Sequence, residues 1–169
     1  MAHTVLAIND RSLKRQIADR VLRALPDWFG IEEALAEYVG QSQDMWLWAA
    51  YAEGTPVGFL SLRQHNPYTW EVFCMGILQN FHRQGIGSRL VAAAERYCGE
   101  HRAEFLTVKT LDASRPNAAY AKTRQFYLAQ GFRPLEVFST LWDGENPCLF
   151  MAKSLALPSR QHPQGGQPR

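Results

Sequence analysis

The sequence has little of several features that would identify a function directly. Its 169 residues include three cysteines, an odd number at the distant positions 74, 98 and 148. This pattern argues against a disulfide framework and matches no metal-binding spacing, so the reducing cytoplasm is the expected compartment. No apolar run is long enough to cross a bilayer, and the N-terminus lacks the apolar stretch of a secretion signal. We therefore expect a cytoplasmic protein that uses neither a metal nor a membrane.

The net charge is small as well. Eighteen Lys and Arg residues oppose sixteen Asp and Glu residues, a formal charge of +2, which argues against a general nucleic-acid binder. The charge is spread unevenly, because residues 24–62 hold six carboxylates and neither Lys nor Arg. Either this distribution reflects chance and solvated helix faces, or the two halves of the chain bind partners of opposite sign.

The composition, 46% apolar and 20% charged, is that of a globular domain with a substantial core. Apolar residues recur at helical spacing over residues 10–25, 31–39, 86–101 and 117–130. Strands are predicted over residues 3–9, 45–52, 57–64, 69–78, 104–109, 132–138 and 147–153. We expect one domain over residues 1–157 and a disordered Pro-, Gly- and Gln-rich tail over residues 158–169.

The lengths of the connections predict how these strands pair. Short turns join the strands between residues 45 and 78, so these strands should be antiparallel, whereas the helix between residues 78 and 104 calls for a right-handed parallel crossover. Gly76, near the end of the strand over residues 69–78, suggests a bulge or a close backbone approach. The expected fold class is α/β, with a mixed sheet flanked by helices.

One segment has the pattern of an anion site. Residues 79–90, QNFHRQGIGSRL, lead from a strand through a polar loop into a helix. The free N–H groups of a helix N-terminus bind phosphate, and Gly85 and Gly87 would let it approach the backbone. Arg83 would add a charged donor. A dinucleotide fingerprint would need a third glycine where Leu90 stands, and a P-loop sequence is absent; a tight turn without a ligand is the remaining alternative.

In this context the glycine loop resembles the [QR]-x-x-G-x-[GA] signature of the GNAT N-acetyltransferases. The run Phe126-Tyr127-x-x-x-Gly131-Phe132 is similar to a second segment of that family, and the order of elements agrees from the first helix to about Lys153. The resemblance implies a central mixed sheet of six to seven strands flanked by about four helices. It also implies the transfer of an acetyl group from acetyl-CoA to a primary amine.

The same resemblance indicates which residues would bind the co-substrate. Pantetheine would lie along the central strand, where a backbone N–H near Ile77 would polarise the thioester carbonyl. The sequence departs from the family at His82, where Gln or Arg is usual, and at Arg83, where glycine is usual. Tyr120 stands where the family often has Asn, and Asn117 either caps the following helix or contacts pantetheine. The cofactor-binding residues implied are Met75, Gly76, Ile77, Leu78, His82, Arg83, Gln84, Gly85, Ile86, Gly87, Ser88, Asn117 and Tyr120.

Two residues are candidates for proton transfer. Tyr127 occupies the position of the family's general acid, and a tyrosine is protonated at neutral pH; the alternative is an aromatic packed in the core. Glu71 is similar in position to the catalytic glutamate of the histone-acetylating branch. On a regular strand it would share an apolar face with Phe73 and Met75, which would raise its pKa by desolvation. It could instead be an exposed carboxylate at a strand edge, and His65 is the alternative base.

The acceptor is less well specified. The resemblance places it beneath the first two helices and their connection, where Trp28, Phe29 and Glu33 lie among several carboxylates. Aromatic and acidic side chains suit a cationic amine, either a small molecule or a peptide. A homodimer formed through the last strands is possible by the same resemblance. The other function consistent with the sequence is an acetyl-CoA-binding sensor without catalysis.

Overall fold

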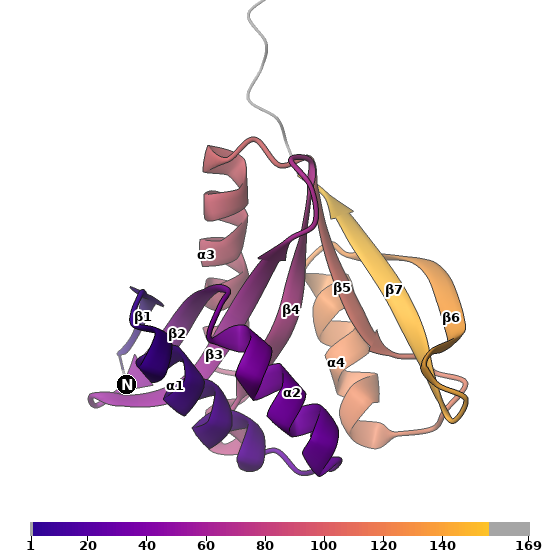
Figure 1. Cartoon of the computed structure of the whole chain (residues 1–169), viewed down its shortest axis with the longest axis horizontal. Coiled ribbons are helices and arrows are strands. Elements are labelled where there is room, and N and C mark those ends of the chain that lie inside the picture. The colour runs from indigo at the N-terminus through magenta and orange to yellow at the C-terminus, as the bar shows by residue number, and fades with distance from the viewer. Residues whose placement is uncertain (1, 156–169) are drawn as a thin grey trace, which may run out of the picture.

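The computed structural model describes residues 2–155 and contains a seven-stranded mixed sheet in the order β1-β2-β3-β4-β5-β7-β6 (Figure 1). The strands are β1 (His3–Ile8), β2 (Trp46–Ala52), β3 (Thr55–Gln64), β4 (Thr69–Ile77), β5 (Phe105–Leu111), β6 (Arg133–Asp143) and β7 (Asn146–Ser154). The helices are α1 (Arg11–Arg23), α2 (Glu32–Ser42), α3 (Ile86–Glu100) and α4 (Ala118–Ala129), with a short 3₁₀ helix, η1 (Gln79–Phe81). The predicted α/β fold is confirmed. The predicted domain end at residue 157 and the tail over residues 158–169 lie outside the described residues.

Helices cover both faces of the sheet. Helices α1 and α2 lie on one face, and α3 and α4 lie on the other (Figure 1). The apolar stripe of α1 is buried against the first face together with Leu47, Phe59 and Cys74. The stripe of α3 is buried against Leu60, Trp70 and Leu106 on the second. Burial of these two stripes is the main favourable contribution to folding.

Local signals set most element ends. Asp10 caps α1, because its carboxylate accepts a hydrogen bond of 2.6 Å from the Leu13 N–H. The hairpin between β2 and β3 turns through two residues, Glu53 and Gly54, whose φ angles of 49° and 76° fit a type I′ turn. Strand β3 therefore begins at Thr55, two residues earlier than predicted.

Helix α2 does not end at Gly40, as the sequence suggested, but continues to Ser42. The Ser42 hydroxyl is buried and donates to Ser61 Oγ on β3 at 3.1 Å. This contact holds the last turn of α2 on the sheet. Gly40 has no positive φ angle, so nothing in its backbone stops the helix.

The cysteines, the helices and the metal-ligating side chain types are described for residues 2–155. All three cysteines are buried and unpaired. Between residues 2 and 155, no helix combines the length and apolar character needed to cross a bilayer. Over the same residues, no three His, Cys, Asp or Glu side chains gather as metal ligands.

Candidate functional site

A cleft opens between β4 and β5 because these strands pair over only part of their length. Their parallel register joins Thr69–Val72 of β4 to Phe105–Val108 of β5. Beyond these residues the strands diverge (Figure 1), and a cavity of about 860 Å³ is lined by both of them, by α4 and by the start of α3. A cleft of this size is typical of a small-molecule site.

The divergence coincides with a bulge in β4. The antiparallel register with β3 changes from Leu62–Val72 to Ser61–Cys74, so Phe73 is the extra residue on β4. A bulge bends the strand that carries it and disrupts its ladder. The bulge therefore turns the second half of β4 away from β5.

The sequence suggested a bulge or a close approach at Gly76, and the structure shows the close approach. Gly76 pairs in regular register with Phe59. A Cβ added to Gly76 would lie 3.1 Å from side-chain atoms of both Leu25 and Val21. A side chain at this position would make Leu25 and Val21 move, because α1 and the residue that follows its C-terminal cap pack tightly on β4.

The bulge also changes which side chains share a face of β4. Glu71 alternates with Trp70 and Val72, which belong to the core under α3, so Glu71 faces the α1–α2 side. Phe73 packs on that side too, but Met75 packs against the α3 core. The prediction that Glu71, Phe73 and Met75 share one face is therefore wrong for Met75, because the bulge shifts the alternation by one residue.

The glycine loop leads directly into α3 at one end of the cleft. Gly85 occupies the N-cap position with a φ of 77°, and no side chain caps this helix. The first-turn N–H groups are therefore available to an anion, and the helix dipole favours negative charge there. A Cβ added to Gly85 would meet nothing within 4 Å, so the space in front of the loop is open.

Gly87 has a different role from Gly85. A Cβ on Gly87 would lie 2.9 Å from two ring carbons of Phe126 and 3.3 Å from the Ile77 side chain. Glycine at this position lets α3 pack closely against α4 and the end of β4. The two glycines thus provide the left-handed turn and the close helix packing that the loop needs.

The polar residues of the loop take separate directions. Arg83, which has a left-handed φ of 59°, lines the cleft. His82 also lines it and donates from Nε2 to the Ile77 carbonyl at 2.6 Å. Gln84 lies outside the cleft lining and accepts a hydrogen bond of 2.9 Å from His3 Nε2. The Gln84 side chain is therefore directed to β1, and cofactor binding by the loop at this residue stays a prediction.

Tyr127 is held at the cleft wall by the C-terminal half of α4. Its side chain is 6% exposed and contacts the rings of Phe126 and Phe132. It also lines the cleft, so the catalytic and core interpretations are both compatible with its position. Burial raises the pKa of the Tyr127 hydroxyl well above its ordinary value. The side chain is therefore protonated at neutral pH and able to donate.

Asn117 and Tyr120 make hydrogen bonds within the protein, and the sequence had left their roles undecided. Asn117 caps α4, because its Oδ1 accepts from the Tyr120 N–H at 3.0 Å, and it does not line the cleft. Tyr120 lines the cleft and donates from its hydroxyl to the Trp28 carbonyl at 2.7 Å. Burial raises the pKa of Tyr120 to about 12. The cap accounts for Asn117 without a cofactor contact.

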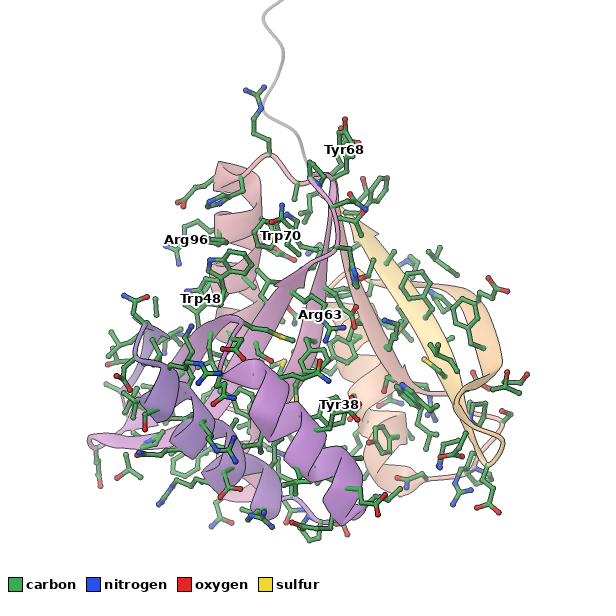
Figure 2. The ribbon with its side chains drawn as sticks, in the orientation of Figure 1. Tyr38, Trp48, Arg63, Tyr68, Trp70 and Arg96 are labelled. Carbon is green, nitrogen blue, oxygen red and sulfur yellow. The ribbon has the colours of Figure 1, made fainter. Side chains whose placement is uncertain are left out.

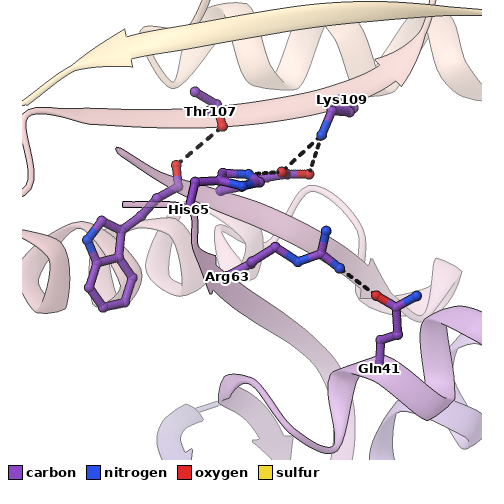
Figure 3. Close-up of polar contacts among 7 residues, drawn as sticks. Gln41, Arg63, His65, Thr107 and Lys109 are labelled. Atoms are coloured by element: carbon purple, nitrogen blue, oxygen red, sulfur yellow. Dashed lines mark hydrogen bonds and ion pairs between the residues drawn. The ribbon is translucent and has the colours of Figure 1, made fainter. Parts of the chain in front are cut away.

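Glu71 is neither exposed nor on an apolar surface. It is 3% exposed, and its carboxylate accepts from Lys109 Nζ on β5 at 3.0 and 3.2 Å (Figure 3). Its other contact is the ring of His65, which is partly exposed at the start of the β3–β4 turn. The two alternative bases considered from the sequence therefore touch each other. The carboxylate is charge-compensated by Lys109, a feature that sequence pattern did not reveal.

The loop after α1 is tied to α4 across the cleft. Trp28 donates from its indole N–H to Thr123 Oγ1 at 3.0 Å, and its ring contacts His82 at a centroid separation of 5.7 Å. Trp28 and Phe29 both line the cleft. That they contact the acceptor stays a prediction.

The acidic residues predicted for the acceptor site lie elsewhere. Glu33 is exposed on α2 and does not line the cleft. Glu32 is paired with Arg23 at 3.0 Å, and Glu37 accepts from Gln41 at 2.7 Å. Among the described residues, no carboxylate lines the cleft. The prediction failed because helical spacing turns these side chains toward solvent and α1.

The predicted cofactor-binding residues divide by position. Those that line the cleft are Met75, Gly76, Ile77, His82, Arg83, Gly85, Gly87, Ser88 and Tyr120. The side chains of Leu78 and Ile86 pack in the core and, like those of Gln84 and Asn117, stand outside the lining, while the Ile86 N–H belongs to the uncapped first turn of α3.

Sequence reasoning gave no functional role to four side chains that line the cleft. Tyr38 comes from α2, Phe73 from the β4 bulge, Lys109 from β5 and Trp142 from β6. Only Lys109 had a usable signal, since parallel pairing places Thr107 beside Glu71 and Lys109 two residues further on the same face.

Comparisons with known proteins agree with this architecture. The family described as Acetyltransferase (GNAT) family matches residues 14–132. No curated protein is matched by the sequence. Among solved structures, the chain is similar to a GNAT-family protein from Desulfovibrio desulfuricans, with 15% identity, a TM-score of 0.76, and 92% of this chain and 100% of that chain covered.

Two further structures share the fold. An aminoglycoside 6′-N-acetyltransferase complexed with coenzyme A has 19% identity and a TM-score of 0.71, covering 94% of this chain and 99% of that chain. The ribosomal-protein-S18-alanine N-acetyltransferase from Escherichia coli has 14% identity and a TM-score of 0.72, covering 95% and 99%. Strands β4 and β5 diverge beyond Val72, and a glycine loop precedes α3. Together with the match of the family over residues 14–132, this shows that the chain belongs to the GNAT acetyltransferase family.

Proposed function

We propose that this protein transfers an acetyl group from acetyl-CoA to a primary amine by direct attack, without a covalent enzyme intermediate. The arrangement of Tyr127 and Glu71 carries this proposal. Tyr127 belongs to the core on the α3–α4 side of the sheet, whereas Glu71 faces the α1–α2 side. Glu71 pairs with Thr107 just before the gap between β4 and β5 opens and does not line the cleft. A proton would therefore reach it from a group held in the gap through water, whereas Tyr127 lines the cleft and can donate directly.

The residues around the glycine loop fit the diphosphate of coenzyme A. The open space before Gly85, the uncapped first turn of α3 and the Arg83 side chain provide backbone donors and positive charge together. The exposed Lys122 on α4 lines the same cleft and adds a second cation. Acetyl-CoA would supply an acetyl group activated as a thioester.

The end of β4 can orient the thioester carbonyl. The Leu78 N–H donates to the Val57 carbonyl on β3 at 2.9 Å. Because adjacent N–H groups of a strand point to opposite edges, the Ile77 N–H points into the gap. A backbone donor held there would stabilise negative charge on a reacting carbonyl oxygen.

Three proton movements complete the reaction. The ammonium group of the substrate loses one proton before the amine attacks the carbonyl carbon, and the Glu71–His65 pair is the candidate base, acting through water. As the C–S bond breaks, the Tyr127 hydroxyl donates its proton to the leaving thiolate, and the second proton lost from the attacking nitrogen restores the Tyr127 hydroxyl.

The experiment that tests this function has two parts. Calorimetry with acetyl-CoA should show binding at micromolar to millimolar concentrations, and a panel of amines should release free thiol. Binding without thiol release from any amine would favour the sensor function instead. No heat with acetyl-CoA would overturn both.

Tyr127→Phe tests the proton donor. We expect kcat to fall by about 10–100-fold, because general acid catalysis commonly contributes that much or more, while the affinity for acetyl-CoA stays the same. Tyr97→Phe on α3 is the matched control, since it removes a hydroxyl from an aromatic cluster outside the cleft. Unchanged turnover in Tyr127→Phe would assign this proton to water.

A homodimer formed through the last strands stays a prediction. Strand β6 exposes Leu135, Val137 and Leu141 at the edge of the sheet, which suits pairing with a second copy. Sedimentation equilibrium tests it.

A further inference from the structure

Arg63 on β3 is a half-buried cation without a carboxylate partner among residues 2–155. Its Nη2 donates to the Gln41 Oε1 on α2 (Figure 3), and its guanidinium carbon lies 4.2 Å from the centroid of the Phe73 ring. A guanidinium has five N–H donors. Over the described residues one of them is used, and its partner is neutral, so no carboxylate is hydrogen-bonded to Arg63.

This guanidinium lies beside the cleft: Arg63 is not part of the lining, but Phe73, on which it stacks, lines the cleft together with Tyr38. Figure 2 shows Arg63 and Tyr38 in the middle of the molecule, whereas Arg96 projects from α3. The end of the cleft formed by Phe73 and Tyr38 therefore has a planar cation next to its aromatic side chains.

The neighbouring charges do not neutralise Arg63. Glu71 is the nearest acidic residue along the sheet, and its carboxylate is bound by Lys109 and His65. Arg63 and Lys109 together with Glu71 give this end of the cleft a positive balance. An incoming cationic acceptor would be repelled, and an anionic group would gain a charge-assisted hydrogen bond.

We propose that the acceptor is a primary amine that also carries a carboxylate, and that Arg63 binds this carboxylate while Phe73 and Tyr38 contact the apolar part of the molecule. This inference rests on the proposed acetyl transfer, since it names the class of amine that uses the same cleft. A guanidinium presents parallel N–H groups that match the two oxygens of a carboxylate. Recognition of this kind would position the amine toward the gap between β4 and β5.

Matched amine pairs test the charge preference. Phenylalanine and 2-phenylethylamine differ only in a carboxylate, as do lysine and 1,5-diaminopentane. Alanyl-glutamate amide and alanyl-glutamine amide form a third pair, which distinguishes a peptide side-chain carboxylate from the α-carboxylate of a free amino acid. We expect kcat/KM to be at least 10-fold higher for the carboxylate member of at least one pair. A preference in every pair for the member that lacks the carboxylate would overturn the proposal.

Arg63→Gln identifies the residue responsible. It should lower kcat/KM for the carboxylate member by about 10–100-fold, mainly through KM, as expected when one charged partner of a recognition pair is lost. The kcat/KM for the member that lacks the carboxylate and the KM for acetyl-CoA should be unaffected. Arg96→Gln, which removes a guanidinium from α3 on the opposite face, is the control and should behave as the wild type. Equal losses for both members in Arg63→Gln would contradict a role in carboxylate binding.

A binding readout separates this inference from the proposed function. Calorimetry with N-acetylphenylalanine and N-acetyl-2-phenylethylamine requires no turnover. Binding of the first alone, lost in Arg63→Gln, would support the carboxylate site even if no amine releases thiol. Thiol release with equal binding of both compounds would retain the acetyltransferase and reject the carboxylate site.

Discussion

Gly85 and Gly87 illustrate how one residue type solves two different problems two positions apart. Gly85 adopts a left-handed backbone in open space, and Gly87 gives room to the Phe126 ring. The first requirement concerns the backbone of Gly85 itself, and the second arises from packing between two helices. A substitution at each position should therefore fail for a different reason.

Gly87→Ala should weaken both packing and co-substrate binding. Its Cβ would be too close to Phe126, and overpacking of this kind costs about 1–3 kcal/mol. We expect a lower free energy of unfolding in urea and at least tenfold weaker acetyl-CoA binding, because α3 must shift away from the cleft.

Gly99→Ala is the control on the same helix. A Cβ there would meet nothing within 4 Å, and alanine is favoured over glycine within a helix by about 0.5–1 kcal/mol. This variant should be slightly more stable with normal binding. A stable, fully binding Gly87→Ala variant would show that α3 tolerates the shift.

Strands β4 and β5 are joined by few contacts, and side chains reinforce them. The Thr107 hydroxyl donates to the Trp70 carbonyl at 3.3 Å, and Lys109 binds Glu71 (Figure 3). These interactions lie where the parallel ladder ends and the cleft begins. They therefore set how far the two strands separate.

Lys109→Met should destabilise the protein by about 2–4 kcal/mol, because it leaves the buried Glu71 carboxylate without its main charge partner. The double variant Lys109→Met with Glu71→Gln should be more stable than the sum of the two single effects predicts, with a coupling of about 1–2 kcal/mol. Urea unfolding of the four proteins measures this cycle. Strict additivity would show that the ion pair does not tie the strands together.

The whole domain buries several weak acids in neutral form. Burial raises the pKa of Tyr38 and Tyr127 beyond the ordinary range and that of Tyr120 to about 12. It also raises the pKa of Cys98 to about 12 and that of Cys148 to about 11. Below the pKa that each group has in the unfolded chain, the group is protonated in both the folded and the unfolded state and contributes fully to stability. This contribution is lost as the pH rises toward the pKa of the folded state.

The free energy of unfolding should therefore decrease as the pH rises from about 8.5 to 12, the interval that begins at the ordinary pKa of cysteine in an unfolded chain. The sign follows because the unfolded chain loses its thiol and phenol protons first. Urea unfolding at a series of pH values measures the slope, and Tyr120→Phe should make it shallower above pH 10. A stability that stays constant up to pH 11 would contradict burial of these groups.

Periodicity, turn residues and the glycine loop were sufficient to predict the order of elements, the mixed sheet and the family. Each of these signals is local: the spacing of apolar residues along α3, the Glu53–Gly54 turn and the left-handed Gly85 depend on near neighbours in the chain. The expectation that Tyr127 belongs to the site came from the resemblance of the segment around Gly131 to the family, and Tyr127 does line the cleft.

Packing between distant segments was needed for the rest. The bulge at Phe73 depends on pairing with β3, the Lys109 contact depends on β5, and the absence of carboxylates from the described cleft lining depends on how α2 turns against α1. Strand alternation along the chain cannot foresee a shift imposed by a neighbouring strand. A helix pattern cannot foresee which carboxylates will find partners. For this reason the local pattern pointed to a cationic acceptor, whereas in the folded protein Lys109 lines the cleft and Arg63 stacks on Phe73 beside it.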